Sequence, residues 1–289
     1  MRAWQIGDIT VTSVVEVDGP APGTFLFDGA TRESVAAKHG WARGSFIDDD
    51  GMLLTRVQAL VVQSGGRTIV VDTCIGNDKQ RPVPSWNMLQ IPFLDRFRAA
   101  GFDPASVDAV VCTHLHVDHV GWNTMLVDGQ WRPTFPGSRY LFAGPEYRHW
   151  AEEPHRLRPE HDDSIQPIVD AGLMDEVDVD AEIAPGVQLV STPGHTPGHC
   201  SVRITSNGSS ALITGDFIHH AVQVASPEWC SHFDTDPVMG ERTRRGFIEE
   251  HADTDLLVIG THFGGPGSGR IVTTDGGHVF LADSSSAST

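Results

Sequence analysis

The sequence predicts an α/β fold in which two β-sheets pack together and carry helices on their outer faces. Strand-like runs rich in β-branched residues occur in clusters in both halves of the chain, and helical stretches interrupt each cluster. Hydrophobic residues make up 39% of the 289-residue chain, which is enough to form the core of one large domain. These observations together favour a layered sandwich.

The first half of the chain supplies the first group of elements. We expect strands over residues 9–17, 57–63, 67–73, 107–114 and 138–144. A helix is expected over residues 88–101, where Gly101 is a typical C-terminal signal. Two more helices are expected, one from Pro145 onward and one around residues 162–174.

The second half repeats the pattern. Strands are expected over residues 186–195, 200–206, 210–216 and 254–263, a helix over 241–253, and a hairpin over 269–281. No low-complexity linker divides the chain, so we expect one domain over residues 1–289. Within it, residues 1–50 are expected to be an N-terminal extension or lid and residues 282–289 a flexible tail. The segment 20–27 could equally be a dimer arm, so a homodimer is one expectation.

Composition excludes several partner classes. The formal net charge is −18, from 20 Lys and Arg against 38 Asp and Glu, which disfavours nucleic acid and anionic membrane surfaces. No apolar run approaches the ~20 residues that span a bilayer, and Asp8 interrupts the N-terminal region where a signal peptide would be apolar. The four cysteines are widely separated and form no CxxC pair, so we expect a cytoplasmic protein without a disulfide framework.

The most specific signal is the motif HxHxDH, which follows the expected strand over residues 107–114. It places His114, His116, Asp118 and His119 in one turn. Neutral imidazole and carboxylate groups are good ligands for divalent zinc. Buried together without compensation they would be unfavourable, since each loses its hydration. One or two divalent cations would provide that compensation.

A two-metal centre needs more ligands than this motif holds, and three later strand ends supply candidates. "STPGHTPGH" carries His195 and His199, "LITGDF" carries Asp216, and "VIGTHFGG" carries His262. Side chains at strand ends commonly project into one shared cleft in α/β folds. Each residue alone would be read as an ordinary turn or core residue, but their joint occurrence in this order favours a metal site.

The order HxHxDH, TPGHTPGH, TGD and GTH resembles the metallo-β-lactamase superfamily, over about residues 59–270. The element "VVDTCIG" is similar to the strand-ending DTG of that family, with Cys74 in place of the glycine. The resemblance implies a four-layer αββα sandwich with two metals at one edge, between the sheets. It implies that the first metal is bound by His114, His116 and His195, the second by Asp118, His119 and His262, and that Asp216 bridges them. His199 would be an outer-shell or structural residue.

The implied chemistry is hydrolysis by a hydroxide shared between two divalent cations, with Asp118 orienting the nucleophile and passing a proton to the leaving oxygen. Zn²⁺ is the expected metal, and Mn²⁺, iron and Co²⁺ also suit nitrogen and oxygen ligands. The run "GDFIHHAVQ" resembles a branch that contains lactonase-like hydrolases and methyl-parathion-type phosphotriesterases. Lactone hydrolases of this family place a tyrosine in that neighbourhood. Here His219 could donate a hydrogen bond to the substrate carbonyl, or His219 and His220 could be core and turn residues.

We therefore expect a binuclear metallohydrolase that acts on lactones or related small neutral esters. Phosphotriester hydrolysis is the main alternative. A glyoxalase II-like thioesterase is disfavoured by the acidic tail, and a β-lactamase by Asp216, because that position commonly holds cysteine in true β-lactamases. A diiron redox protein and a catalytically inactive scaffold rank lower. An apolar substrate pocket is expected, and its candidate wall residues are Phe25, Phe27, Trp86, Met88, Tyr147, Trp150 and Trp229, with Trp86 preferred.

Overall fold

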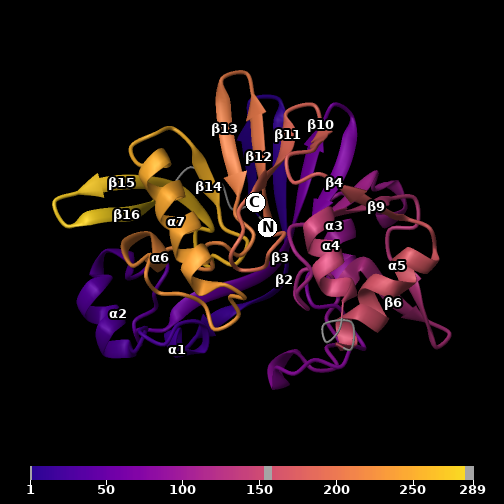
Figure 1. Ribbon diagram of the computed structural model, residues 1–289, viewed down its shortest axis with the longest axis horizontal. Helices are drawn as coiled ribbons and strands as arrows, with labels where there is room; N and C mark the ends of the chain where they lie inside the picture. Colours follow the sequence, from indigo (N-terminus) through magenta and orange to yellow (C-terminus); the bar gives the residue numbers. More distant parts are fainter. Residues whose placement is uncertain (1, 153–157, 284–289) are drawn as a thin grey trace.

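The computed structural model describes residues 2–152 and 158–283. Within these residues two seven-stranded sheets and a two-stranded ribbon form, and the two large sheets pack together between two layers of helices (Figure 1). The four-layer αββα sandwich expected from the sequence is confirmed.

The first sheet is built from the N-terminal half of the chain. Its parallel part runs from β4 through β5 and β8 to β9, and its antiparallel part joins β1, β2, β3 and β4. In sheet order the strands are β1 (Arg2–Ile6), β2 (Ile9–Ala21), β3 (Leu53–Ser64), β4 (Arg67–Val71), β5 (Ala109–Cys112), β8 (Arg139–Ala143) and β9 (Met174–Val177).

The second sheet follows the order of the sequence. Its strands pair antiparallel except for β13 and β14, which are parallel. The strands are β10 (Glu182–Ala184), β11 (Val187–Ser191), β12 (Cys200–Ser206), β13 (Ser209–Ile213), β14 (Leu257–Ile259), β15 (Ser268–Thr274) and β16 (Gly277–Ala282). The separate ribbon consists of β6 (Thr124–Val127) and β7 (Gln130–Pro133).

The helices cover the outer faces of the sheets. In Figure 1, α3, α4 and α5 lie beside the first sheet, and α6 and α7 lie beside the second. The α-helices are α1 (Gly23–Leu26), α2 (Arg32–Lys38), α3 (Phe93–Ala99), α4 (Gly144–Ala151), α5 (Gln166–Asp170), α6 (Val222–Ala225) and α7 (Pro237–His251). Short 3-10 turns occur at Gly40–Ala42, Pro84–Trp86, Pro104–Ser106 and Gly121–Asn123, and a π-helical turn at His161–Ile165 precedes α5.

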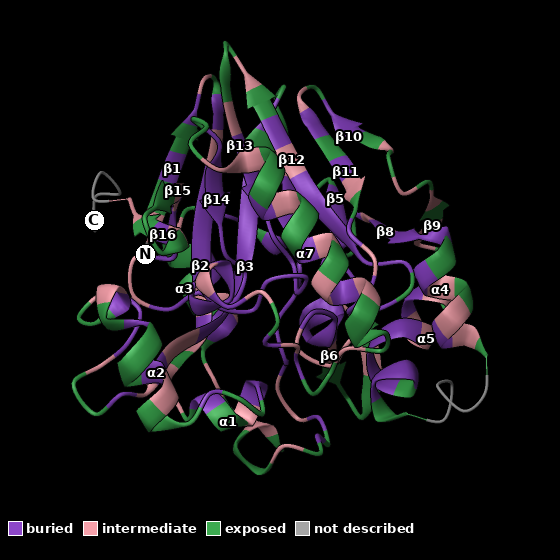
Figure 2. Ribbon diagram, turned by 60° about the vertical axis from the view of Figure 1, so that its left-hand side comes forward, coloured by how far each residue is buried: buried purple, intermediate pink, exposed green. Residues whose placement is uncertain are grey.

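Buried apolar side chains fill each gap between layers. Alternate residues of the strands, such as Val62 and Val202, meet between the two sheets. The opposite face of the first sheet packs against Phe93 and Phe97 of α3. A third cluster joins the second sheet to α6, α7 and residues 26–53. Figure 2 shows the consequence, because the strands are largely buried and the outward faces of the helices are exposed.

Several elements differ from the expected ones. The helix expected over residues 88–101 begins only at Phe93, since Met88 has a positive φ of 53° and Pro92 precedes the first turn. The β6–β7 hairpin was not expected, although its turn, Asp128-Gly129, is a favoured two-residue hairpin sequence with φ values of 50° and 74°. The short strands β9 and β10 were also not expected.

The segment 1–50, expected as an extension or lid, has two parts. Strands β1 and β2 belong to the first sheet, and β2 pairs with β3 from Thr10 opposite Gln63 to Ala21 opposite Leu53. The following residues, with α1 and α2, pack through Phe27 into the third cluster. Of the expected tail, residues 284–289 lie outside the described part of the chain. No helix among the described residues is both long and apolar enough to span a membrane.

The strand directions bring the predicted ligands to one edge. Strands β4 and β5 are parallel, so the segments after both leave the first sheet at the same edge. In the second sheet β11, β13 and β14 run in one direction, because β12 is antiparallel to both β11 and β13. The segments after these strands carry Asp72, residues 114–119, His195, Asp216 and His262.

Stability should fall as the pH drops from about 6.5 to about 4. Burial lowers the pKa of His220 from 6.5 to about 4, where its Nε2–H donates to the Phe46 carbonyl at 3.1 Å. Between these pH values the unfolded chain binds the proton and the folded chain does not, so stability is lost as pH falls. Replacing the residue (His220→Gln) should flatten the pH dependence of the urea midpoint relative to wild type. The control variant His278→Gln, at a partly exposed position, should show the wild-type pH dependence of the urea midpoint. Equal pH dependence of the urea midpoint in all three proteins would contradict this assignment.

Candidate metal centre

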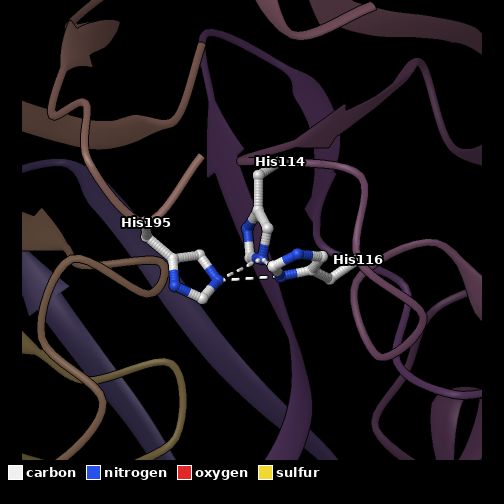
Figure 3. A group of neighbouring side chains, drawn as sticks. All are labelled: His114, His116 and His195. Atoms are coloured by element: carbon white, nitrogen blue, oxygen red, sulfur yellow. Dashed lines mark hydrogen bonds between the residues drawn. The ribbon is translucent and has the colours of Figure 1, made fainter. Parts of the chain in front are cut away.

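The first ligand group contains His114, His116 and His195, whose rings point toward one another (Figure 3). His116 Nδ1 lies 2.8 Å from His195 Nε2, and His114 Nε2 lies 3.0 Å from His116 Nδ1 and 3.2 Å from His195 Nε2. His114 and His116 follow β5, whereas His195 follows β11 of the other sheet. Ligands from both halves of the chain therefore meet at one point, as the sequence predicts.

The second group contains Asp118, His119 and His262. His119 Nε2 is 3.1 Å from His262 Nε2, and the two Asp118 oxygens lie 3.8 Å and 3.5 Å from these nitrogens. His119 and His262 are buried, whereas Asp118 remains partly accessible. All three face one point beside the first group, so the second predicted ligand set also converges.

Asp216 lies between the two groups. Its Oδ1 is 3.1 Å from His262 Nε2 and 3.3 Å from His119 Nε2. Its Oδ2 faces the first group, at 3.6 Å from His195 Nε2 and 3.8 Å from His114 Nε2. One oxygen therefore faces each group, which is the arrangement that a bridging carboxylate requires.

The chemistry of this donor set fits divalent cations. Burial lowers the pKa of His114, His116 and His195 well below 6.5, which favours the neutral imidazole form that binds metal ions. The carboxylate of Asp216 is buried among the rings of both groups, 3.1 Å to 3.8 Å from four imidazole nitrogens. Such a buried polar cluster is unfavourable unless a cation is shared among its members. The described side chains of both groups form metal-ligand clusters by distance.

The carboxylates give the second group a different electrostatic environment. Burial lowers the pKa of His262, but Asp216 and Asp118 outweigh this effect and raise it to about 9. The same carboxylates, together with Asp72, hold the pKa of His119 above its usual value despite burial. Their negative charge favours a positive charge at this position, whether a proton or a metal ion.

A further set of groups fixes the orientation of the imidazole rings. Asp72 Oδ2 is 2.9 Å from His119 Nδ1, and Asp234 Oδ1 is 2.8 Å from His195 Nδ1. The nitrogen of His262 that faces away from the centre, Nδ1, donates to the Arg56 carbonyl at 2.7 Å. Such contacts select the tautomer and direct the other nitrogen to the metal.

The roles of Asp72 and Asp234 did not emerge from the sequence. Asp72 stands in the quoted element "VVDTCIG" and has a φ of 59°, and it also accepts hydrogen bonds from the backbone and hydroxyl of Thr113. Its position directly after a buried strand was the available signal. Asp234 lies in a long loop before α7, where the sequence pattern gives no indication of its partner.

His199 has a structural role next to the bridging carboxylate. Its Nε2 accepts a hydrogen bond from the backbone N–H of Asp216 at 2.8 Å, and its Nδ1 lies 2.8 Å from the hydroxyl of Thr192. It belongs to none of the ligand clusters found among the described residues. The outer-shell or structural role that the resemblance implied for His199 stays a prediction, and these contacts support it.

His219 and His220 separate into two environments. His219 lies beside the candidate metal centre, with Nε2 3.2 Å from Asp216 Oδ2, and it forms a further group with His195 and Asp216 whose ligand atoms are close enough to share a metal ion. His220 points away, into contact with the Phe46 carbonyl. Of the pair, His219 is therefore the residue that a substrate can reach.

The centre opens into a cavity of about 1160 Å³. Its apolar wall includes Phe25, whose ring centroid lies 6.4 Å from that of Trp86 and 5.9 Å from that of Phe233. The cavity is also lined by Met88, Trp150, His116, Asp118 and His219. Trp86, Phe25 and Trp150 thus lie where the sequence placed them, and Phe233 is a wall residue that sequence reasoning missed.

Three expected wall residues do not line the cavity. Phe27 and Trp229 stack on each other at 6.3 Å within the third core cluster, because the turn of α1 directs Phe27 inward. Tyr147 packs against the outer side of the first sheet. Phe27 still contacts the site indirectly, since its ring meets the edge of His219 at 6.3 Å.

Comparison with known proteins agrees with this geometry. The family model "Metallo-beta-lactamase superfamily" matches residues 54–234. An N-acyl homoserine lactonase from a Bacillus species is 29% identical over 120 residues, covering 41% of this chain and 42% of that protein. The N-acyl homoserine lactonase AttM of Rhizobium radiobacter is 28% identical over 181 residues, covering 58% of this chain and 63% of that protein. The chain thus aligns with less than two thirds of the length of these relatives.

Two solved structures share the whole architecture. The hydrolase AbOPH has a TM-score of 0.79 at 22% identity, covering 97% of this chain and 96% of that one. The dizinc quorum-quenching lactonase AidC has a TM-score of 0.76 at 20% identity, covering 98% of this chain and 97% of that one. The family model spans more than half of the sequence, so the chain belongs to the metallo-β-lactamase superfamily.

Proposed function

We propose that this protein is a binuclear zinc hydrolase that opens the ring of lactones. The observation that carries the proposal is the convergence of two ligand groups on Asp216 at the floor of an apolar-walled cavity. The partial similarity to N-acyl homoserine lactonases supports a lactone as substrate. Zinc is favoured because the first group consists of three neutral imidazoles, which suit this ion.

Bound divalent cations would lower the pKa of water and polarise the carbonyl group under attack. The protein would hold them through His114, His116 and His195 on one side and Asp118, His119 and His262 on the other, with Asp216 between. The rigid outer contacts of these rings fix them before substrate arrives, so little reorganisation is needed during the reaction.

We assign the proton transfer to Asp118. It lines the cavity and is partly accessible, whereas Asp216 is buried between the two histidine groups. A carboxylate at the cavity floor can accept a proton from the attacking water through Oδ1 or Oδ2. It can then return that proton to the ring oxygen as the lactone C–O bond breaks.

We assign binding of the substrate carbonyl to His219. Its ring lines the cavity, its Nε2 lies 3.2 Å from Asp216 Oδ2, and Phe27 and His195 contact it at ring distances of 6.3 Å and 4.8 Å. An imidazole held in this way can donate an N–H to the carbonyl oxygen as negative charge develops there.

The cavity wall suits a neutral substrate with an apolar substituent. Phe25, Trp86 and Phe233 line the cavity, with the ring of Phe25 in contact with the other two, and these rings would shield an apolar chain from water. A phosphotriester is the second candidate, because it too is neutral and the cavity of about 1160 Å³ is larger than a simple lactone ring requires.

The purified protein should bind two zinc ions per chain, and Asp234→Asn should weaken the first site about 10- to 100-fold. The carboxylate of Asp234 lies 2.8 Å from His195 Nδ1. An asparagine amide at this position can instead donate a hydrogen bond to Nδ1, which would favour the wrong tautomer of His195. Zinc affinity is measured by competition with a chromophoric chelator. The exposed Asp178→Asn is the control and should match wild type. Equal affinities in all three proteins would remove Asp234 from the centre.

Lactone hydrolysis should require the metal and should exceed the other activities in a common screen. The screen contains γ-lactones with and without an acyl-amide chain, a phosphotriester, a β-lactam and S-lactoylglutathione. Chelation should abolish lactone turnover, and added zinc should restore it. Lactone turnover that survives complete metal removal would refute the mechanism, and preferential phosphotriester turnover would select the second candidate.

Replacing His219 (His219→Ala) should lower kcat for lactones by about 10²-fold, because it removes a donor that acts on the developing oxyanion. Zinc content should stay at the wild-type value. His278→Ala, on β16 away from the cavity, serves as the control. An unchanged kcat/KM would exclude the carbonyl-donor role, and loss of zinc would show that His219 acts on the metal instead.

A further inference from the structure

Glu146, in the first turn of α4, is fully buried and bonded to both of the loops that carry the first ligand group. Its Oε1 accepts from the backbone N–H of Leu115 at 3.0 Å, and its Oε2 accepts from the backbone N–H of Gly198 at 3.1 Å. Leu115 lies between His114 and His116, and Gly198 belongs to the turn that begins at His195. A single carboxylate thus connects segments from the two halves of the chain.

A third hydrogen bond links this carboxylate to the ring beside the metal centre. Trp150 Nε1 donates to Glu146 Oε1 at 2.6 Å, and the indole meets the His116 ring edge-on at a centroid distance of 5.2 Å. Burying a carboxylate is costly unless its oxygens are well bonded. The three N–H donors provide that compensation, so their positions are coupled to the position of the carboxylate.

The backbone of the second loop packs closely against the start of α4. A Cβ atom on Gly198 would lie 2.1 Å from the backbone nitrogen of Glu146, so the start of the helix rests directly on this loop. Movement of either loop would break a bond to the carboxylate or force the backbones together. The distance between His116 and His195 is therefore set partly through this residue.

We propose that Glu146 is a positioning residue for the first metal site, holding the His114–His116 loop and the His195 loop at the separation that metal binding requires. The inference rests on the metal centre of the proposed function but does not depend on the substrate. The outer contacts of the second ligand group go to Asp72 and the Arg56 carbonyl instead. Loss of Glu146 should therefore affect the first site selectively.

The chain offers a matched control in Glu16. This carboxylate is also buried and also accepts three N–H donors, from Ile75 at 2.8 Å, Gly76 at 3.0 Å and Trp122 Nε1 at 2.6 Å. It joins the loop after β4 to the indole of Trp122, three residues beyond His119, and its three bonds go to neither of the loops that carry the first ligand group. Glu16→Gln and Glu146→Gln therefore remove comparable hydrogen bonds, and only Glu146→Gln removes a connection between the two loops of the first ligand group.

The test compares zinc retention and stability in these two variants. Both should lower the thermal midpoint of the metal-free protein. After dialysis against a graded zinc buffer, Glu16→Gln should retain two zinc ions per chain and Glu146→Gln one, with the affinity of the lost site reduced about 10- to 100-fold. Mass spectrometry of the metal content gives the count without any activity assay, so failure to find lactone turnover leaves this result interpretable.

Double variants identify the site that is lost. Glu146→Gln combined with His262→Ala should retain no zinc, because each change weakens a different site. The double variant Glu146→Gln/His116→Ala should still retain one zinc ion, because both changes act on the same site. Zinc retained by the variant with His262→Ala and lost by the variant with His116→Ala would overturn the assignment to the first site.

Equal zinc retention by Glu146→Gln and wild type would overturn the proposal, as would equal loss of zinc by Glu146→Gln and Glu16→Gln. If Glu146→Gln does not fold, Glu146→Asp replaces it. That variant keeps the buried charge but is one methylene too short to bond both loops, so it should show the same selective loss of one zinc ion. Retention of both ions by a folded Glu146→Asp would equally reject the positioning role.

Discussion

The architecture of this protein is organised around a buried cluster of imidazoles and carboxylates that a shared cation would stabilise. Imidazole nitrogens of the first group face one another at distances near 3 Å, and the buried carboxylate of Asp216 lies 3.1 Å to 3.8 Å from four imidazole nitrogens. In a low-dielectric environment such a cluster opposes folding. Divalent cations convert the same contacts into favourable ones, so the fold and the chemistry depend on a single electrostatic requirement.

The two sheets meet this requirement by converging at their edges. Each sheet ends its ligand-bearing strands on the same side, and three buried apolar layers hold the sheets in register. Outer groups such as Asp72, Asp234 and Glu146 then fix individual loops. The apolar layers thus determine where the ligands lie, and the buried carboxylates determine which way they point.

Much of this organisation was predictable because short stretches of sequence determine it. The strands of the inner layers are continuous apolar runs, and the seven candidate ligands lie in short motifs that directly follow these strands. Phe27 and Trp229 were misplaced because an aromatic residue beside a proline or glycine turn can face either the core or a cavity, and only the tertiary packing decides. Asp234 and Glu146 bond to partners far away in sequence, so no local pattern could assign their roles.

The distribution of the ligands along the chain also has a consequence for biosynthesis. The first group is complete once His195 has been made, whereas the second must wait for His262, which lies in the last tenth of the 289-residue chain. Because a domain folds as a unit, and β14, the strand before His262, lies between β13 and β15 in the second sheet, that sheet is incomplete until β14 to β16 have been made. Neither group then has its final geometry in a shorter nascent chain, so both metal ions would be captured only after these strands have been synthesised.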